Sequence, residues 1–189
     1  MTELEKLRAG LEFDFTDPVI DALKFNALKL CQKLNATDIT DISAREVIIR
    51  ELFGSVGKKP VVCLGFNCNI GKNIRVGNNF HVDNNVTIFD SAEVQIGNNV
   101  LISPNTLITT VQHPMSPKRR RQHTATAFPV KIGNDVWIGA NVTIVPGVKI
   151  GNNVVVAVGS IVTKDVPDNS LIGGSPAKVF KTLVDDTEA

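Results

Sequence analysis

The sequence predicts a fold dominated by β-structure, in which a parallel β-solenoid with the outline of a triangular prism follows a short α-helical segment. Three observations support this prediction. An aliphatic residue returns at every sixth position over most of residues 64–162. Gly-Asn, Gly-Lys and Pro-Gly pairs, which tolerate the backbone of tight corners, lie between these positions. Residues 1–59 lack this rhythm and carry apolar residues at helical spacing instead.

The N-terminal segment, residues 1–59, is expected to contain two or three short helices. Asp17 and Pro18 together form an N-cap followed by proline at the first helical position, so a helix is predicted from there to Leu34. Ser43 and Glu46 have the spacing of a capping box and predict the start of a further helix. We expect these helices to cover the open first coil of the solenoid, because an unpaired strand edge promotes aggregation.

The solenoid is predicted over residues 60–168. The repeat places fourteen aliphatic residues in one register, with an eight-residue step and a 24-residue break: Leu64, Ile70, Val76, Val82, Ile88, Ile96, Ile102, Ile108, Ile132, Ile138, Ile144, Ile150, Val156 and Val162. Short strands joined by corners and stacked coil on coil would bury such a ladder. Three hexads per turn predict roughly five coils.

The rhythm breaks after Ile108, where an excursion loop is predicted at residues 113–129. This loop contains three prolines and four consecutive basic residues, Lys118–Arg121. Long loops in compact domains are more often functional than accidental. A solvated loop face is the favoured interpretation of the basic run, ahead of a clamp for phosphate. Residues 169–189 are predicted to form a C-terminal tail whose end, LVDDTEA, frays.

Composition argues against several classes of partner. Twenty Lys and Arg against nineteen Asp and Glu give a net charge of +1, so no overall field attracts nucleic acid or a membrane surface. The opening residues are too charged for a secretory signal, and no apolar run approaches the ~18 residues of a membrane span. The three cysteines, Cys31, Cys63 and Cys68, show no zinc-type doublets and are expected to be reduced thiols. A cytoplasmic protein is therefore expected.

Two side chains stand at outward positions of the predicted prism. His113 is the fifth residue after the inward Ile108, and Trp137 is the fifth after Ile132. An exposed indole usually lies against a loop, a neighbouring subunit or a ligand. A histidine on a rigid wall suits a general base, because its unperturbed pKa of ~6.5 is near working pH. The competing interpretation of His113 is an ordinary surface histidine.

The chain also resembles a known family, the hexapeptide-repeat sugar O-acetyltransferases of the maltose and galactoside type. The matching stretches are VQHP at 111–114, PVKIGNDVWIGANVTIVPGVKIGNNVVVAVGSIVTKDVP at 129–167, GGSPAKV at 173–179 and the opening EKLRAGLEFDFTDP. This resemblance implies a left-handed parallel β-helix. It also implies a homotrimer whose sites lie between subunits, with residues 1–59 on the acceptor side.

For the chemistry, the resemblance implies acetyl-CoA as acyl donor and a small hydroxyl compound as acceptor. In the family, the histidine that matches His113 takes a proton from a sugar hydroxyl, which attacks the thioester directly. Such general-base catalysis contributes roughly 10²–10⁴ in rate. No cysteine lies on the matching motifs, so a covalent cysteine relay is not expected, and no metal is required.

Acceptor-binding residues are carried over from the family at fewer positions. Asp14 matches an acceptor-binding aspartate, and a carboxylate can accept two sugar hydroxyl hydrogen bonds. Asn69 falls near another polar acceptor contact of one relative. Ser91 stands where that relative has an acceptor-binding aspartate, which argues against a galactoside as the acceptor.

One position departs from the family near the reacting centre. Asp83 stands where asparagine is common, and its carboxylate is expected either to hold His113 in one tautomer or to repel the developing oxyanion. We favour the first of these, which assigns Asp83 a catalytic role through His113. Asn85 is expected to compensate for the missing asparagine, although its place in the hexad is typical of a corner.

The acetyl-CoA site is implied to run along the wall between coils. The residues assigned to it are Ala140, Val158, Thr163, Lys164, Lys178 and the exposed Trp137. A serine is common where Ala140 stands, so only the backbone amide of Ala140 can serve. The two lysines can neutralise the phosphates of CoA as mobile point charges.

Other functions remain open at this point. An acetyltransferase acting on another hydroxyl or an amine shares the same wall. A γ-type carbonic anhydrase needs three histidines at one metal, and the chain has His81, His113 and His123, although their spacing does not resemble that class. A non-catalytic β-helix scaffold is the third alternative.

Overall fold

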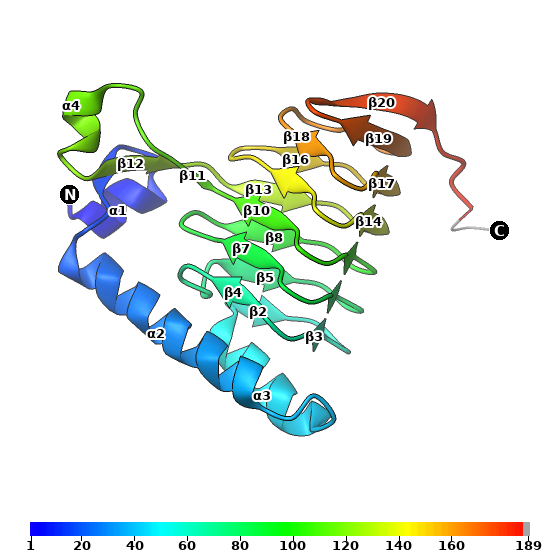
Figure 1. Cartoon of the computed structure of the whole chain (residues 1–189), viewed down its shortest axis with the longest axis horizontal. Helices are drawn as coiled ribbons and strands as arrows, with labels where there is room; N and C mark the ends of the chain where they lie inside the picture. The colour runs from blue at the N-terminus through cyan, green and yellow to red at the C-terminus, as the bar shows by residue number, and fades with distance from the viewer. Residues whose placement is uncertain (187–189) are drawn as a thin grey trace.

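The computed structural model describes residues 1–186, as a stack of short-stranded coils with helices along one end (Figure 1). Three parallel sheets within these residues form the faces of the prism, which we call walls 1, 2 and 3. Wall 1 contains β2 (Ser55–Val56), β5 (Ile74–Val76), β8 (Val94–Ile96), β13 (Val130–Ile132) and β16 (Lys149–Ile150). Wall 3 contains β4 (Asn67–Cys68), β7 (Thr87–Phe89), β10 (Leu107–Thr109), β15 (Thr143–Ile144) and β18 (Ile161–Val162).

Wall 2 extends further along the stack than the predicted solenoid. Its parallel strands are β3 (Val61–Val62), β6 (His81–Val82), β9 (Leu101–Ile102), β14 (Val136–Ile138), β17 (Val154–Val156) and β19 (Ser170–Gly174). The strand β20 (Ala177–Thr182) then folds back antiparallel on β19. Much of the segment that was expected to be a tail is therefore paired. The expected frayed end spans residues 183–189, of which 187–189 lie outside the described residues.

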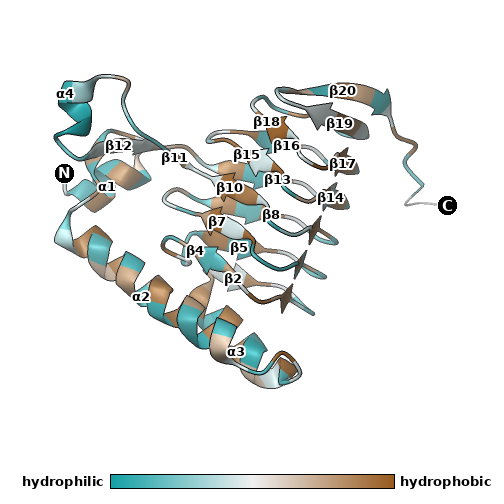
Figure 2. Ribbon diagram, in the orientation of Figure 1, coloured by the Kyte–Doolittle hydropathy of each residue, from teal (hydrophilic) through white to brown (hydrophobic). Residues whose placement is uncertain are grey.

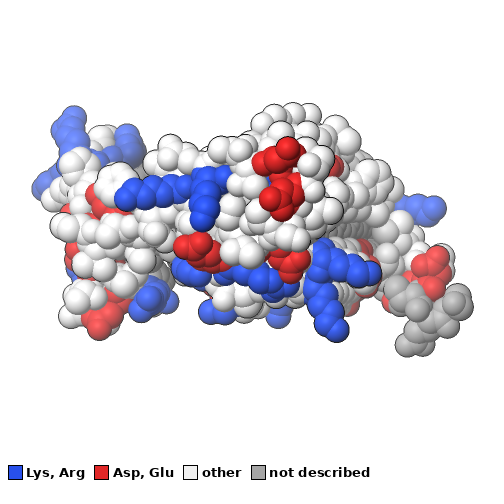
Figure 3. Space-filling view, turned by 90° about the horizontal axis from the view of Figure 1, so that it is seen from below, with Lys and Arg blue, Asp and Glu red and all other residues white. Residues whose placement is uncertain are grey.

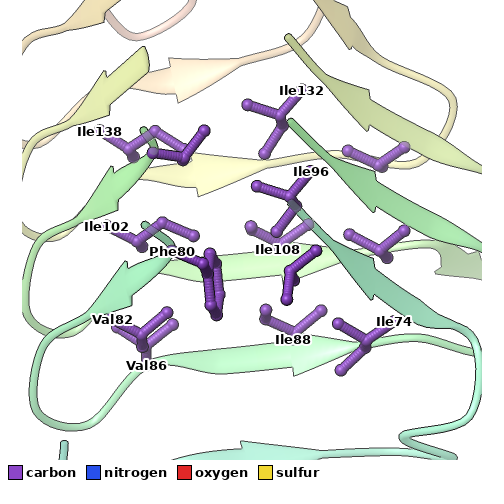
Figure 4. Packing of buried hydrophobic residues seen from close by; sticks show 14 of the residues in the cluster. Ile74, Phe80, Val82, Val86, Ile88, Ile96, Ile102, Ile108, Ile132 and Ile138 are labelled. Carbon is purple, nitrogen blue, oxygen red and sulfur yellow. The ribbon is translucent and has the colours of Figure 1, made fainter. Parts of the chain in front are cut away.

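The hexad ladder forms the core, as the repeat predicts. Parallel pairing places Ile88, Ile108 and Ile144 directly above one another, and each is fully buried. Figure 4 shows Ile88, Ile108 and other aliphatic side chains of the cluster in the interior between the walls. The three-residue strands of walls 1 and 2 follow an inward, outward, inward pattern, so each of them supplies two inward residues, such as Ile74 and Val76. At about 25 cal/mol per Å² of apolar surface removed from water, this ladder is the main source of stability.

The first predicted position of the ladder is wrong. Leu64 is 41% exposed, and Phe66 is buried there instead. Phe66 packs against Phe53, with ring centroids 5.6 Å apart, and Phe53 follows directly on the N-terminal helices. The helical cap therefore selects which residue faces inward at the end of the prism.

The cap consists of α2 (Pro18–Ala36) and α3 (Ile42–Leu52), which lie across the first coil (Figure 1). The predicted cap of α2 is confirmed, since Asp17 accepts hydrogen bonds from Val19 and Ile20. The predicted capping box at Ser43 is wrong. The N-cap of α3 is Asp41, whose carboxylate accepts from Ala44 N at 3.0 Å. An aspartate two residues earlier provides the cap, so Ser43 falls in the first turn of the helix.

Buried polar contacts connect the cap to the solenoid. Arg45 is 4% exposed, and its guanidinium donates to the carbonyl oxygens of Leu34, Thr37 and Val62. Apolar residues on α2 recur at helical spacing and face the coil, in agreement with the alternation of brown and teal along this helix in Figure 2.

The excursion has more regular structure than the predicted loop. It contains β11 (Val111–Gln112), the short helix α4 (Pro117–Arg120) and β12 (Thr124–Ala127). Strand β12 pairs antiparallel with both β11 and β1 (Phe13–Asp14), and β1 follows α1 (Glu3–Arg8). The excursion and the N-terminal segment, which both lie outside the repeat, thus form one small sheet beside the prism.

Charge is mixed over the surface. Figure 3 shows acidic and basic side chains interspersed on one face, in keeping with the net charge of +1. Among residues 1–186, no helix combines the length and the apolar character that crossing a membrane requires.

Candidate active site

A pocket of about 290 Å³ lies between the N-terminal segment, wall 3 and the excursion. It is lined by Leu7, Phe13, Phe15, Ile20, Lys24, Asn69, Ile70, Phe89, Ser91, Val111 and His113. The N-terminal residues arrive through α1, β1 and α2, whereas Val111 and His113 come from β11 and the residue that follows it. Antiparallel pairing of β12 with β1 and β11 holds these two contributions together.

The imidazole of His113 is positioned by the excursion and by the N-terminal segment. Its Nδ1 lies 3.3 Å from the carbonyl oxygen of Thr124 on β12. A carbonyl oxygen only accepts, so Nδ1 carries the proton and Nε2 carries the lone pair. The ring of Phe15 meets the imidazole edge-on, with centroids 5.1 Å apart. This environment leaves Nε2 as the basic atom, in the tautomer that a general base needs.

One side of the pocket is built around a buried carboxylate, that of Asp90, which the sequence analysis missed. Asp90 is fully buried and accepts from the backbone N–H groups of Asn69 and Ile70, both at 2.9 Å. Burial raises the pKa of Asp90 to about 6, and these backbone hydrogen bonds oppose the rise. The neighbouring Asn69 and Ser91 side chains are joined by a hydrogen bond of 2.8 Å. The sequence carries a signal for this feature, because the hexad register steps by eight residues between Ile88 and Ile96.

Asn69 and Ser91 line the same pocket as His113. Asp14 does not line the pocket, although its neighbours in sequence, Phe13 and Phe15, both do. Its carboxylate accepts from the hydroxyl and the N–H of Thr16, which lowers the pKa of Asp14. The chain thus brings Asn69, Ser91 and His113 to one cavity and leaves Asp14 at its border.

Asp83 and Asn85 are elsewhere in the chain. Asp83 follows β6 on wall 2 and lies 3.1 Å from His81 Nε2. Asn85 occupies a solenoid corner with a φ of 59°, the left-handed region that asparagine tolerates. Neither residue lines the pocket that contains His113, so the expected contact of Asp83 with His113 is not made within one chain. The reason is topological. Asp83 follows a strand of wall 2, whereas the excursion connects β10 of wall 3 to β13 of wall 1.

The residues expected to bind acetyl-CoA lie toward the C-terminal coils. Ala140 and Val158 are at corners of neighbouring coils, where Gly159 N donates to the carbonyl of Ala140 at 2.9 Å. Thr163, Lys164 and Lys178 are exposed. Trp137 is 49% exposed, and its indole N–H donates to Ser103 Oγ at 3.1 Å. None of these residues lines the His113 pocket within the chain.

The basic run is partly used to hold the excursion. Arg119 forms an ion pair with Glu12, and Arg120 donates to the carbonyl oxygens of Pro114 and Met115. These contacts fasten α4 to the N-terminal segment and close the loop on itself. The four basic residues are exposed, in agreement with the favoured interpretation as a loop face.

The three histidines do not meet within the described chain. His113 and His123 both pack edge-on against Phe15, with His123 at 5.6 Å between centroids. His81 instead lies on wall 2 with Asp83 and Cys63. Within residues 1–186 the three histidines therefore form no single cluster.

The sequence of the chain matches known families and relatives. Two family models match the chain, "Maltose acetyltransferase hexapeptide capping motif" over residues 6–57 and "Bacterial transferase hexapeptide (six repeats)" over residues 129–164. The galactoside O-acetyltransferase of Escherichia coli K12 is 37% identical over 191 residues, covering 98% of this chain and 91% of the relative.

Solved structures show the same likeness over nearly the whole chain. A maltose O-acetyltransferase from Clostridium difficile has a TM-score of 0.96 at 39% identity, covering 98% of this chain and 99% of the other. A hexapeptide-repeat acetyltransferase from Vibrio cholerae, solved in complex with acetyl-CoA, has a TM-score of 0.89 at 40% identity, covering 98% and 100%.

Proposed function

Since the chain belongs to the hexapeptide-repeat sugar O-acetyltransferase family, we propose that it transfers the acetyl group of acetyl-CoA to a hydroxyl of a sugar or related small acceptor. The observation that carries the proposal is the placement of His113 in a pocket built jointly by the capping segment and the excursion. A relative of the chain was solved with acetyl-CoA bound, which supports this thioester as the donor.

The proposed reaction is a direct transfer. With Nδ1 donating to the Thr124 carbonyl, His113 Nε2 removes the proton of the acceptor hydroxyl. The hydroxyl oxygen attacks the thioester carbonyl carbon and forms a tetrahedral intermediate. The C–S bond then breaks, and the imidazolium returns its proton to the departing sulfur of CoA. The Thr124 carbonyl stabilises the imidazolium between these two steps, because its hydrogen bond becomes charge-assisted.

The pocket suits a small acceptor with both polar and apolar faces. Asn69, Ser91 and Lys24 provide polar side chains, and Phe15 and Phe89 provide aromatic surface. Aromatic rings in sugar sites pack against C–H faces, while amide and hydroxyl groups bond to the hydroxyls. Asp14, one residue from Phe15, is proposed to receive acceptor hydroxyls at the border of the pocket.

We assign the donor and the quaternary structure from the family. The CoA moiety is proposed to lie along the corners of Ala140 and Val158, with Thr163, Lys164 and Lys178 at its phosphates and Trp137 beside it. Since these residues do not line the His113 pocket of the same chain, a second subunit has to supply them. This requirement supports a homotrimer with active sites between prisms. Asp83 would then act on His113 of the partner subunit.

The test is release of free CoA from acetyl-CoA with a panel of sugars, small alcohols and amines, using the native protein and His113→Ala. We expect sugar-dependent release that the substitution abolishes. Release with amines alone would overturn the sugar assignment while leaving an acetyltransferase. Binding of acetyl-CoA without turnover on any acceptor would likewise overturn the sugar assignment. Failure to bind acetyl-CoA would favour a non-catalytic scaffold.

A further inference from the structure

Three metal-binding side chains gather on the outer surface of wall 2. The thiol of Cys63, a ring nitrogen of His81 and a carboxylate oxygen of Asp83 all lie within 4.8 Å of one another. The closest pair is His81 Nε2 and Asp83 Oδ1, at 3.1 Å. The Cys63 cluster, as we call these three residues, is separate from the pocket that contains His113.

The cluster follows from the register of the solenoid. Strands β3 and β6 pair in parallel with Val62 opposite Val82, so Cys63 stands beside Asp83 on the next coil. His81 precedes Asp83 by two residues, which places both side chains on the same face of the strand. Val82, between them, is fully buried. The outward direction of all three side chains is thus determined by the hydrophobic ladder beneath them.

The backbone beneath the cluster is rigid. The N–H groups of Cys63, His81 and Asp83 donate to carbonyl oxygens on the following coil, at 2.8, 2.9 and 2.9 Å. Within a single chain each side chain is half-buried, so the cluster is open on its outer side, which in the proposed trimer faces the cleft between subunits. A ligand that binds there finds donors already held by the fold and pays little backbone entropy.

The donor set selects the class of ion. Sulfur, imidazole nitrogen and carboxylate oxygen together are typical of Zn²⁺, whereas Mg²⁺ and Ca²⁺ prefer oxygen alone. Zinc–ligand bonds of roughly 2.0–2.3 Å place neighbouring donors of a tetrahedral site about 3–4 Å apart. The His81–Asp83 separation already has this value, and the thiol of Cys63 lies within 4.8 Å of both donors.

We propose that Cys63, His81 and Asp83 form a binding site for Zn²⁺ or a similar borderline divalent cation, with water in the fourth position. The imidazole and the carboxylate bind as the neutral ring and the anion, and Cys63 binds as the thiolate, releasing its proton to solvent. Asp83 belongs both to this site and to the proposed contact with His113 of the partner subunit, but the test reads metal binding directly and does not depend on acetylation activity.

Cobalt serves as a spectroscopic probe for the site. The full-length, untagged protein is reduced, freed of metal with a chelator and titrated with Co²⁺. We expect a thiolate-to-cobalt charge-transfer band in the near ultraviolet that saturates at one Co²⁺ per chain, and that Zn²⁺ abolishes. A titration of the native protein without this band overturns the proposal.

Matched variants assign the ligands. Cys63→Ser should remove the charge-transfer band, whereas Cys68→Ala should keep it. The Cys68 thiol lies in another part of the structure, with its Sγ 3.5 Å from the Sγ of Cys31. His81→Gln should weaken Co²⁺ binding at least about tenfold, since loss of even an outer-shell partner costs about 10–100-fold. A band that survives Cys63→Ser, or is lost in Cys68→Ala, contradicts the assignment. Circular dichroism of each variant controls for folding, and His81→Gln keeps the test decisive if Cys63→Ser does not fold.

Discussion

The Nδ1 atom of His113 faces the carbonyl oxygen of Thr124 at 3.3 Å, and the two residues flank the segment that carries α4 between β11 and β12. This contact fixes the imidazole tautomer and leaves Nε2 as the base. Because β12 is itself paired with β1, the contact also makes the chemistry depend on the N-terminal segment. The first prediction concerns this histidine.

His113→Ala should lower kcat by roughly 10²–10⁴, the contribution of a general base, while leaving acetyl-CoA binding unchanged. The matched control is His123→Asn. His123 also packs on Phe15 but does not line the pocket, and asparagine tolerates its φ of 56°. Steady-state kinetics and acetyl-CoA binding check the pair. Equal losses in both variants would assign His113 a structural role.

Asp90 should make folding stability depend on pH. Its pKa is about 6 in the folded chain, against ~3.9 for an unperturbed aspartate, so the folded state binds more protons between these values. Stability from this group is therefore present below about pH 4 and is lost as pH rises to about 6. The difference in unfolding free energy between wild type and Asp90→Asn should fall by up to roughly 3 kcal/mol over this range.

The measurement for Asp90 is urea unfolding of both proteins from pH 4 to pH 8 at one protein concentration. Comparing the two proteins cancels the titration of other carboxyl groups. A difference that is independent of pH would mean that Asp90 does not titrate in this window. A difference that grows with pH would reverse the sign and contradict the burial of the charge.

Replacement of Arg45 should weaken the cap. Arg45→Met removes the guanidinium donor from the carbonyls of Leu34, Thr37 and Val62, at a cost on the order of 3 kcal/mol. Lys29→Met, on the exposed face of α2, serves as control and should change stability by less than ~0.5 kcal/mol. Urea midpoints at matched protein concentration check both variants. Equal midpoints would show that the cap does not depend on Arg45.

Replacing the lysines assigned to CoA should weaken the binding of acetyl-CoA and leave the binding of the acceptor unchanged. Lys164→Gln or Lys178→Gln should raise the KM for acetyl-CoA by up to about fivefold, since an exposed charge pair is worth about 0.2–1 kcal/mol. The effect should shrink at high salt. Lys131→Gln, an exposed lysine on wall 1, is the control. A change in acceptor KM alone would remove these lysines from the CoA site.

Asp83 should act only across subunits. If its carboxylate increases the basicity of the partner subunit's His113, then Asp83→Asn moves the acidic limb of the kcat/KM profile to lower pH. Turnover and a pH profile that both stay unchanged would contradict this role. The assay is run without divalent metal, so that any effect of the Cys63 cluster is kept apart.

Local patterns predicted much of the fold. The six-residue repeat predicted the inward residues from Val76 onward, and Asp17 with Pro18 predicted the start of α2. These features depend on steric and hydrogen-bonding preferences of neighbouring residues. Ile70, like Leu64, lies outside the prism core and packs against the N-terminal segment instead. The cap of α3 was missed because Ser43 and Asp41 both have cap-forming side chains, and sequence spacing does not rank them.

The features that were missed depend on contacts between distant segments. No periodicity in residues 113–129 indicates that β12 pairs with β1, because that sheet joins segments more than a hundred residues apart. The repeat predicts Leu64 as an inward residue, yet the helical cap supplies Phe53, against which Phe66 packs instead. Asp90 was overlooked because an aspartate in a turn is ordinary unless its burial is known.

By itself, the sequence determined the solenoid, the interruption at the excursion and the identity of His113 as the candidate base. Each of these follows from the spacing of residues close in sequence or from a short motif. Only the tertiary structure decided that Asp83 lies with His81 and Cys63, while His113 lies with Thr124 and Phe15. Coil register brings together residues about twenty positions apart on one wall, and the choice of wall separates residues that any linear pattern treats alike.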